Sequence, residues 1–439
     1  MKEAGVHEQA IEVFAHYYGR LESGDTGMLP EPDIEPISTM ERLADLDVDD
    51  EQARVALRDT AVVKLNGGLG TSMGMDRAKS LVEVHDGMTF LDLIAAQARS
   101  IRERFDVRLP VMFMNSFRTR RDTLEALAGH PGLAVDGLPL DFLQNQEPKL
   151  LVDDLTPAQW PDEPELAWCP PGHGDLYTAL NTSGALRALL DAGFRLAFVS
   201  NADNLGAMPD PRVAGWFAST GAPFAVEACR RTPSDRKGGH LAVRKADGHL
   251  VLRESAQTRD EDEDAFADIE RHRYFNTNNL WLDLQALARA LEETDGVLGL
   301  PLIRNVKHVD PSDPSTPEVI QIETAMGAAV EVFEGATAIE VDRSRFLPVK
   351  TTNDLLVLRS DVYEVNDHAQ LVVAPARGRP APFVDLDPAH YRLLREFEAR
   401  FPAGPPSLVD ADRFVVAGDI VFGAGCVVRG DADLDAGLG

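Results

Sequence analysis

The stretch at residues 62–80, VVKLNGGLGTSMGMDRAKS, constrains the fold of this chain more than any other. The apolar run at residues 61–63 predicts a buried strand, and the polypeptide then passes directly into a glycine-rich loop. Glycine lets backbone N–H groups converge on an anion because no Cβ intervenes. The glycines of this loop are Gly67, Gly68, Gly70 and Gly74. A strand that feeds such a loop is a candidate phosphate cradle, with a tight turn as the alternative.

Polar side chains in the same loop fit that interpretation. Thr71 and Ser72 offer hydroxyl donors, and Lys79 adds one mobile positive charge. The glycine spacing matches neither the GxxxxGK[ST] pattern of P-loop ATPases nor the GxGxxG fingerprint of dinucleotide-binding folds, so both classes are set aside.

The net charge limits the partners of the chain. With 72 acidic and 43 basic residues, the formal charge of −29 argues against a non-specific nucleic-acid surface or an anionic-membrane surface. A phosphate site must then be locally basic, and anionic substrates call for a divalent cation because the overall field gives little help. A chain of 439 residues is expected to form two or three domains.

Cysteine usage and hydropathy indicate the compartment. Cys169, Cys229 and Cys426 are scattered and lack CxxC or CxxH spacing, so we interpret them as reduced thiols. No run of about eighteen apolar residues occurs, and the acidic start MKEAGVHEQ lacks the features of a signal peptide. We therefore expect a cytoplasmic protein with neither membrane nor nucleic acid as a partner.

Hydrophobic periodicity divides the chain into four regions. Amphipathic patterns around residues 10–17 and 40–57 predict helices ahead of the core, and residues 354–365 and 391–400 predict helices after it. The expected regions are an N-terminal helical segment (1–60), an α/β catalytic domain (61–352), a helical linker region (353–410) and a short C-terminal β-helix (411–439).

In the α/β region, apolar strands alternate with helical patterns, which predicts a largely parallel sheet. Ligands of such sheets bind beyond the carboxyl ends of the strands, and the polar stretches described below do follow apolar runs. The expected strands are 110–114, 196–200 and 224–228, and the expected helices are 90–104 and 122–128.

The tail has a period of six residues. Such a period is typical of a β-helix, which buries one side chain per face and turns at glycine, and an accidental run of hairpins is the alternative. One phase holds Phe414, Ile420, Cys426, Ala432 and Leu438, and the other holds Val416, Phe422, Val428 and Leu434.

Two stretches carry groups suited to phosphate chemistry. In FVSNADNLGA a buried strand ends just before Asp203, where a carboxylate can hold Mg²⁺ against substrate phosphates; an Asx-turn cap is the alternative. In DRSRFLPVKTTNDL, Lys350 follows a proline-stiffened run with Arg343 and Arg345 nearby, which suits a second phosphate clamp or a solvated lysine. No Ser-His-Asp arrangement, HExxH motif or cysteine cluster supports covalent or zinc chemistry.

Three further loops hold polar groups on a stiff backbone. In FLQNQEP, the Gln144 amide can read both donors and acceptors on a nucleobase edge, with a surface turn as the alternative. In PPGHGD, His173 lies between two glycines that can bring backbone N–H groups against a ligand, although a lone histidine is usually structural. In YFNTNNLW, the amides of Asn276, Asn278 and Asn279 suit sugar hydroxyls or a turn.

A resemblance to a known family rests on seven stretches taken in order: LNGGLGTSMG with Lys79-Ser80, WCPPGHGDLY, FVSNADNLGA, KGGHLA, FNTNNLW, VIQIETAMGAAVEVF and RSRFLPVKTTNDLL. Together they resemble the UTP–glucose-1-phosphate uridylyltransferases of the eukaryotic type. The resemblance implies an α/β nucleotidyltransferase fold, GT-A-like and Rossmann-like, with a mixed sheet, N-terminal helices and a short C-terminal left-handed β-helix. It also implies transfer of the uridylyl group of UTP to glucose 1-phosphate, with Mg²⁺ as cofactor.

The same resemblance implies roles for individual residues. Lys350 would stabilise the phosphates between which the bond changes, Lys79 would bind the UTP phosphates, and Asp203 would bind Mg²⁺. The implied substrate-binding residues are, for uracil and ribose, Gly67 and Gly68; for the base, Gln144 and Gly172; for the glucose phosphate side, His173 and Asn201; for the sugar, Gly239, Glu254, Asn276 and Asn278; and, beside these, Leu65, Gly70, Thr71 and Gly174.

Two departures and two alternatives accompany the resemblance. Arg77 and Ala78 stand where the family commonly has Gly-Pro, which leaves the segment before Lys79 less rigid, and the shorter tail leaves homo-oligomerisation open. One alternative is a UDP-N-acetylhexosamine or broad-specificity UDP-sugar pyrophosphorylase, but those relatives usually carry GTR where this loop reads GTSM. The other is a non-catalytic UDP-sugar sensor with the same fold.

Overall fold

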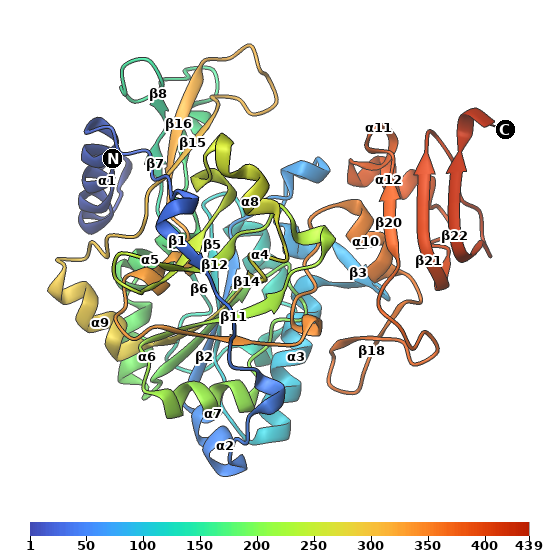
Figure 1. Cartoon of the computed structure of the whole chain (residues 1–439), viewed down its shortest axis with the longest axis horizontal. Helices are drawn as coiled ribbons and strands as arrows, with labels where there is room; N and C mark the ends of the chain where they lie inside the picture. Colours follow the sequence, from blue (N-terminus) through green and yellow to red (C-terminus); the bar gives the residue numbers. More distant parts are fainter. Residues whose placement is uncertain (439) are drawn as a thin grey trace.

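The computed structural model describes residues 1–438, apart from the side chains of Ser72 and Leu438. Helices cover both faces of a large mixed sheet, and a smaller sheet stands beside it at the C-terminal end (Figure 1). The strands of the large sheet follow the order β1 (Ile34–Pro36), β12 (His240–Arg244), β14 (Tyr274–Asp283), β10 (Leu196–Asn201), β2 (Thr60–Asn66), β5 (Val111–Asn115) and β6 (Asp141–Leu143), while β11 (Phe224–Arg230) pairs with β14 and β17 (Thr337–Glu340), and β13 (Leu250–Arg253) with β12.

The central strand β2 is buried at every position because both faces of the sheet are covered. Val62 packs into one core and its neighbour Val63 into another, as the alternation of side chains along a strand requires. The first core includes helices α3 (Phe90–Phe105) and α7 (Pro211–Thr220), and the second includes α5 (Leu176–Thr182), α6 (Ala185–Asp191) and α9 (Leu284–Glu293).

The ends of helix α3 are set by local signals in the sequence, so its predicted boundaries agree with the structure. It begins at a capping box in which Asp92 N donates to Thr89 Oγ1 at 3.1 Å and Thr89 N donates to Asp92 Oδ2 at 2.9 Å. It ends where Asp106 takes a left-handed conformation with φ of 52°. The predicted helix at 90–104 is thereby confirmed. The helix expected at 122–128 is also confirmed, as α4 (Arg120–Leu127).

The direction of the strands differs from the prediction of a largely parallel sheet. Strands β2, β5, β6 and β10 do run parallel, but β14 is antiparallel to both β10 and β11. The chain between β11 and β14 makes an excursion through β12, β13 and α8 (Glu263–Ala267) rather than a helical crossover, so β14 returns in the opposite direction. The sheet is mixed, as the family resemblance implied.

The N-terminal region is only partly helical. Helix α1 (Glu8–Glu22) confirms the first predicted helix, but of the second, at 40–57, only the latter part forms, as α2 (Asp50–Arg58). Between them, β1 pairs with β12 at the edge of the large sheet, with Ile34 opposite Arg244. The region is therefore fastened to the core by a strand that the helical pattern did not reveal.

The C-terminal region also departs from the prediction. The helix expected at 354–365 stops early, as α10 (Thr352–Arg359), and Tyr363–Val365 instead forms β18, which pairs with β19 (Leu371–Val373). Two short helices follow, α11 (Pro388–Tyr391) and α12 (Leu394–Arg400), where one helix was expected at 391–400.

The period of six in the tail corresponds to parallel strands. Strand β21 (Ser407–Ala417) pairs with β20 (Phe383–Leu386) and with β22 (Val427–Asp435), all in parallel. Phe414 lies opposite Ala432 and Val416 opposite Leu434, eighteen positions apart in each case. Each residue of a predicted phase on β21 is therefore paired with a residue of the same phase on β22. The side chain of Leu438, which continues the first phase, lies outside the description.

The remaining strands form small sheets beside the large one. These sheets comprise β15 (Ile303–His308), β16 (Glu318–Glu323) and β8 (Leu150–Leu151); β3 (Glu83–His85) and β4 (Met88–Thr89); and β7 (Glu147–Pro148) and β9 (Trp168–Cys169).

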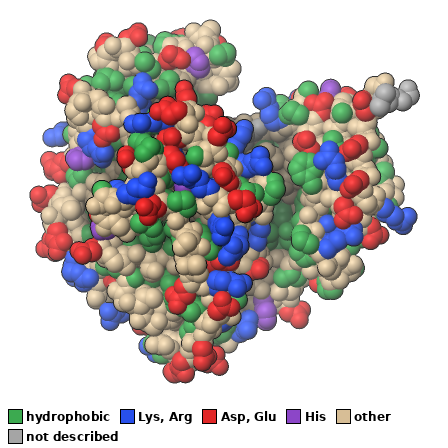
Figure 2. Space-filling model, in the orientation of Figure 1, with side chains coloured by type: hydrophobic (Ala, Val, Ile, Leu, Met, Phe, Trp, Pro, Cys, Tyr) green, Lys and Arg blue, Asp and Glu red, His purple; other side chains and the backbone are tan. Residues whose placement is uncertain are grey.

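Acidic and basic side chains are intermingled over the visible face, and the surface is hollowed between the main body and the C-terminal sheet (Figure 2). None of the helices among residues 1–438 is long and apolar enough to cross a membrane.

Candidate active site

Three residues expected to contact the nucleobase meet beyond the carboxyl end of β2. Gln144 Nε2 donates to the carbonyl oxygen of Gly172 at 2.7 Å. A Cβ added at Gly67 would lie 2.8 Å from Gln144 Oε1, so a side chain there would displace the Gln144 amide. Ser116 Oγ, at the end of β5, donates to the Gly67 carbonyl at 3.0 Å and holds the loop in place.

The glycine-rich loop folds back on itself and returns Lys79 to the end of the sheet. Lys79 N donates to the Gly68 carbonyl at 3.1 Å, and Thr71 lies exposed in the short 3₁₀ turn between Gly70 and Gly74. At the end of β10, Asn201 is in register with Leu65, and Ala202 N donates to the Leu65 carbonyl at 2.9 Å. The ends of β2 and β10 therefore lie side by side, as parallel strands require.

Three distant segments converge on Lys79. Lys79 Nζ lies 2.7 Å from Asp203 Oδ2 and also donates to the Val349 carbonyl. Val349 N in turn donates to the Asp203 carbonyl at 3.2 Å, which places Lys350 next in the chain. Lys350 is exposed, with Nζ 5.9 Å from the centre of the Phe346 ring. The structure thus brings Lys79 and Asp203 together, and the contacts of Val349 place Lys350 next to this pair in the chain.

The PPGHGD loop packs against Thr324. Thr324 N donates to the Pro171 carbonyl at 3.1 Å, and Gly174 N donates to the Thr324 carbonyl at 2.8 Å. Gly172 has φ of 77°, and a Cβ there would lie 2.6 Å from the Thr324 carbonyl oxygen, so the position requires glycine.

The loop also fixes the protonation state of His173. The Met326 N–H donates to His173 Nδ1 at 2.9 Å. Because burial lowers the pKa of His173 to about 4, the ring is neutral at physiological pH and carries its proton on Nε2. His173 is thus a hydrogen-bond donor with a fixed tautomer.

The asparagines of the long strand β14 are held by a β-bulge. The pairing with β11 shifts register between Glu227 and Ala228, which leaves Asn278 with φ of 58°. Asn276 Nδ2 donates to Asn278 Oδ1 at 2.7 Å, and Asn278 N donates back to Asn276 Oδ1 at 2.9 Å. A bulge next to a site re-aims side chains, so two amides of one strand come to share a face.

Gly239 and Glu254 lie close to this asparagine pair. Asn276 N donates to the Gly239 carbonyl at 3.0 Å, and a Cβ at Gly239 would lie 2.4 Å from a Glu254 carboxylate oxygen. Burial raises the pKa of Glu254, and the charge of Lys350 acts against that rise. The sugar-side residues are therefore within electrostatic reach of the second lysine.

Lys64 is a member of the site region that the sequence analysis missed. It lies in the middle of β2 with no exposed surface, and its Nζ donates to Ser200 Oγ at 2.8 Å and to the Ala207 carbonyl. These partners stand on either side of Asp203, so the amine ties both ends of the Asp203 loop to the sheet. Burial lowers the pKa of Lys64 to about 7. A lysine within an apolar strand run was the signal available.

The two arginines near Lys350 do not form part of a free phosphate clamp. Arg345 pairs with the fully buried Glu227, with Nε 2.7 Å from Oε2 and Nη2 2.6 Å from Oε1. Arg343 pairs with Asp235, with Nη1 2.7 Å from Oδ2. The expectation for these arginines is therefore wrong: a buried carboxylate needs a partner, and each guanidinium supplies one.

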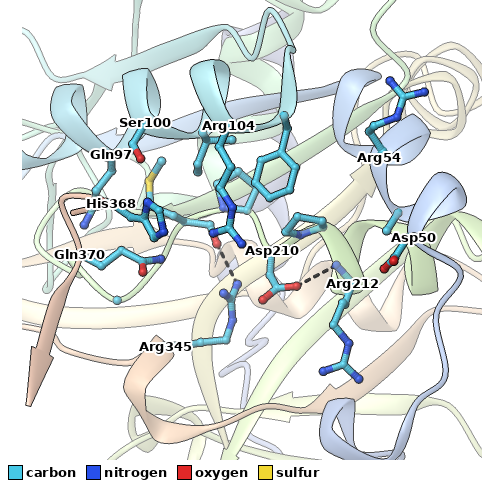
Figure 3. Close-up of a pocket in the computed structure, with 17 residues that line it drawn as sticks. Asp50, Arg54, Gln97, Ser100, Arg104, Asp210, Arg212, Arg345, His368 and Gln370 are labelled. Atoms are coloured by element: carbon cyan, nitrogen blue, oxygen red, sulfur yellow. Dashed lines mark hydrogen bonds between the residues drawn. The ribbon is translucent and has the colours of Figure 1, made fainter. Parts of the chain in front are cut away.

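One sizeable cavity lies away from Lys79, Asp203 and Lys350. It measures about 550 Å³ and lies among α2, α3, α7 and the β18–β19 turn, and none of the predicted site residues lines it (Figure 3). Several of its polar groups are already engaged: Arg54 pairs with Glu51 at 2.6 Å, and Arg345 with Glu227. Convergence of side chains, rather than cavity size, therefore defines the candidate site.

Fold and site together define a nucleotidyltransferase-like α/β protein. A mixed sheet ends in a glycine-rich loop, and beside it a lysine pairs with an aspartate and with the backbone carbonyl of Val349. The chain belongs to the UTP–glucose-1-phosphate uridylyltransferase family, whose model matches residues 11–429.

Curated relatives agree with this membership. The UTP–glucose-1-phosphate uridylyltransferase of Solanum tuberosum is 37% identical over 441 residues, covering 99% of this chain and 90% of that protein. The protein of the same name from Saccharomyces cerevisiae is 40% identical over 375 residues, covering 85% of this chain and 73% of the other.

Solved structures of similar proteins cover nearly the whole chain. A mutant of UDP-glucose pyrophosphorylase from Leishmania major, in complex with UDP-glucose, matches with a TM-score of 0.92 and 43% identity over 99% of this chain and 96% of that one. A Trypanosoma brucei protein described as UDP-glucose phosphorylase matches with a TM-score of 0.90 and 42% identity, covering 98% and 92%.

Proposed function

We propose that this chain transfers the uridylyl group of UTP to glucose 1-phosphate and releases UDP-glucose and pyrophosphate. Family membership and the names of the relatives support the reaction. The observation that carries it is the convergence of three segments of the chain, in which Lys79 pairs with Asp203 and the backbone of Val349, which precedes Lys350, contacts both. Two cations and a carboxylate at one place suit a reaction between two polyanions.

The chemistry needs charge neutralisation and alignment more than proton transfer. An oxygen of glucose 1-phosphate forms a bond to the α-phosphorus of UTP, and the bond from that phosphorus to the bridging oxygen breaks, so pyrophosphate leaves with the electron pair. The attacking oxygen is already anionic at neutral pH, so no general base is required. In this mechanism Lys79 binds the UTP phosphates, and Lys350 stabilises the charge at the reacting phosphates.

Mg²⁺ is the proposed cofactor, held by Asp203. Among residues 1–438, no group of three or more His, Cys, Asp or Glu side chains has the arrangement of a metal site. A single carboxylate is nevertheless the donor set expected for Mg²⁺ that also binds substrate phosphates. The Asp203 carboxylate is partly exposed and paired with Lys79, so it fits this role. When bound, Mg²⁺ would neutralise phosphate charge.

The remaining predicted residues divide between the two substrates. We assign the uridine side to Leu65, Gly67, Gly68, Gln144 and Gly172, and the UTP phosphates to Gly70 and Thr71 beside Lys79. The glucose 1-phosphate side takes His173, Gly174, Asn201, Gly239, Glu254, Asn276 and Asn278. The fixed donor on His173 Nε2 and the coupled amides of Asn276 and Asn278 suit phosphate and sugar hydroxyl oxygens.

Two further features support proposals about the architecture of the tail and the location of the protein. The eighteen-position register between β21 and β22 supports a short left-handed β-helix in the tail, since that offset holds three six-residue repeats. The three free cysteines support a cytoplasmic location.

A pyrophosphate-release assay with UTP, Mg²⁺ and glucose 1-phosphate tests the proposal. We expect turnover with glucose 1-phosphate to exceed that with galactose or N-acetylglucosamine 1-phosphate, and Asp203→Ala to lower turnover by orders of magnitude while the fold remains intact. A preference for the N-acetyl sugar would indicate the UDP-N-acetylhexosamine alternative. UDP-glucose binding without pyrophosphate release would indicate a sensor.

A further inference from the structure

A buried ion cluster lies behind the strands that carry the sugar-side residues, and the proposed reaction does not use it. Its centre is the carboxylate of Glu31, from the N-terminal region. Arg253 Nη1 lies 2.5 Å from Glu31 Oε2, Arg271 Nε lies 2.7 Å from Oε1, and His272 Nε2 lies 3.0 Å from Oε1. Asp262 accepts from Arg253 Nη2 at 3.1 Å and from the Glu31 backbone N–H at 2.9 Å.

The cluster is buried and balanced in charge. Arg253 and His272 have no exposed surface, and Glu31 is 8% exposed. Burial lowers the pKa of His272, so its ring is neutral and two arginines stand opposite two carboxylates. Removing the negative charge of Glu31 would leave Arg253 with only one carboxylate partner in a dry environment, which is costly.

Members of the cluster are chain neighbours of the proposed sugar-side residues. Arg253 directly precedes Glu254, and its cross-strand partner His240 directly follows Gly239. Glu254 continues the extended backbone past the end of β13, with φ of −91° and ψ of 159°. Successive side chains of an extended chain point to opposite faces, so Arg253 and its cross-strand partner His240 lie behind the face that carries Glu254.

A second connection reaches the asparagines. His240 lies opposite Phe275 in the ladder between β12 and β14, and Phe275 precedes Asn276. His240 also stacks on His272 with ring centres 3.8 Å apart, which links this part of the sheet to the Glu31 carboxylate. The three segments that carry Gly239, Glu254 and Asn276 thus adjoin one cluster.

The N-terminal region that supplies Glu31 lies across this cluster and is held by backbone hydrogen bonds. Leu29 N donates to the Gln257 carbonyl at 2.9 Å, and Lys245 N donates to the Asp33 carbonyl at 2.9 Å. Strand β1 then pairs with β12. Backbone hydrogen bonds on both sides of Glu31 fix its position, as a residue that orients others requires.

From this geometry we infer that Glu31 is a positioning residue for the glucose 1-phosphate half of the site, acting through Arg253 and His272 on the strands of Gly239, Glu254 and Asn276. The inference rests on the proposed function. It assigns to the N-terminal region a part in substrate selection that Glu31 performs through Arg253 and His272. The uridine-side residues Leu65, Gly67 and Gly68 lie on or just after β2, which β10 separates from β14 in the sheet.

The test compares Glu31→Gln with Glu35→Gln, an exposed carboxylate on β1, in steady-state kinetics. A displacement of about 1 Å costs up to a hundredfold, so we expect the KM for glucose 1-phosphate to rise about tenfold in Glu31→Gln. The KM for UTP should stay within about twofold, and Glu35→Gln should match the wild type. An equal rise in both KM values, or a glucose 1-phosphate KM equal to that of Glu35→Gln, would overturn the inference.

A second variant and a binding measurement keep the test decisive if Glu31→Gln folds poorly. Arg271 is half exposed, so Arg271→Gln should fold and should shift the same KM in the same direction by a smaller factor. Calorimetric affinities for UDP-glucose and UDP should show a weaker UDP-glucose preference in both variants, and an unchanged preference would overturn the inference. Failure of the wild type to release pyrophosphate would instead refute the proposed function, and the affinity ratio would still test Glu31.

Discussion

Replacing Lys64 by methionine should change how stability depends on pH, in a direction that the structure determines. Burial lowers the pKa of Lys64 from 10.5 to about 7, while an unfolded chain keeps the ordinary value. Between these values the unfolded chain holds a proton on this amine that the folded chain lacks. Unfolding therefore takes up a proton. In this range the contribution of Lys64 to the free energy of unfolding increases by about 1.4 kcal/mol per pH unit.

Urea unfolding of the wild type and Lys64→Met at about pH 7.5 and about pH 9 measures this effect. Between the two pH values, the free energy of unfolding of the wild type should rise by about 2 kcal/mol more than that of the variant, because the other titrating groups cancel in the difference. Lys307→Met, at a half-exposed lysine, is the control and should show no such gain. Equal pH dependence in wild type and Lys64→Met would show that the buried amine keeps its ordinary pKa, and would refute this reasoning.

Three further predictions test other parts of the molecule. Lys350→Ala should lower the rate of pyrophosphate release roughly a hundredfold or more with an unchanged melting temperature, because the side chain is exposed; near-normal activity would contradict the clamp role. Gly172→Ala should destabilise the protein by about 1–3 kcal/mol and reduce activity, since the residue combines φ of 77° with a contact that a Cβ would violate; calorimetry and the same assay measure both. Arg345→Met should cost about 3–5 kcal/mol by leaving a buried carboxylate unpaired, whereas Arg343→Met, at a half-exposed side chain, should cost less in the same unfolding experiment.

Motifs at strand ends were predictable because their signals are local. An apolar run followed by glycines, or by Asp203, shows where a strand stops, and parallel strands bring such ends to one edge. The structure accordingly unites Gly67, Gln144 and Gly172, and Lys79 with Asp203.

Other features depend on partners that lie far away in the chain. Tyr363 begins a strand because of its pairing with Val373, which a helical pattern cannot reveal. The sequence around Arg345 does not show its carboxylate partner, Glu227, which lies 118 positions earlier in the chain. The arginine was therefore expected to be a free cation. Lys64 stands within an apolar strand run, but its complete burial follows only from the covering of both sheet faces, which the local sequence does not show.

The meeting of three segments at Lys79 has a consequence for how the protein acquires activity. The contacts of Lys79 span 124 and 270 positions of sequence, so they close long loops and form only after much of the chain is ordered. A growing chain that has emerged only as far as α7 contains the glycine-rich loop and Asp203, but it still lacks residue 349. Activity should therefore switch on late in synthesis, which makes product formation a readout of completed folding.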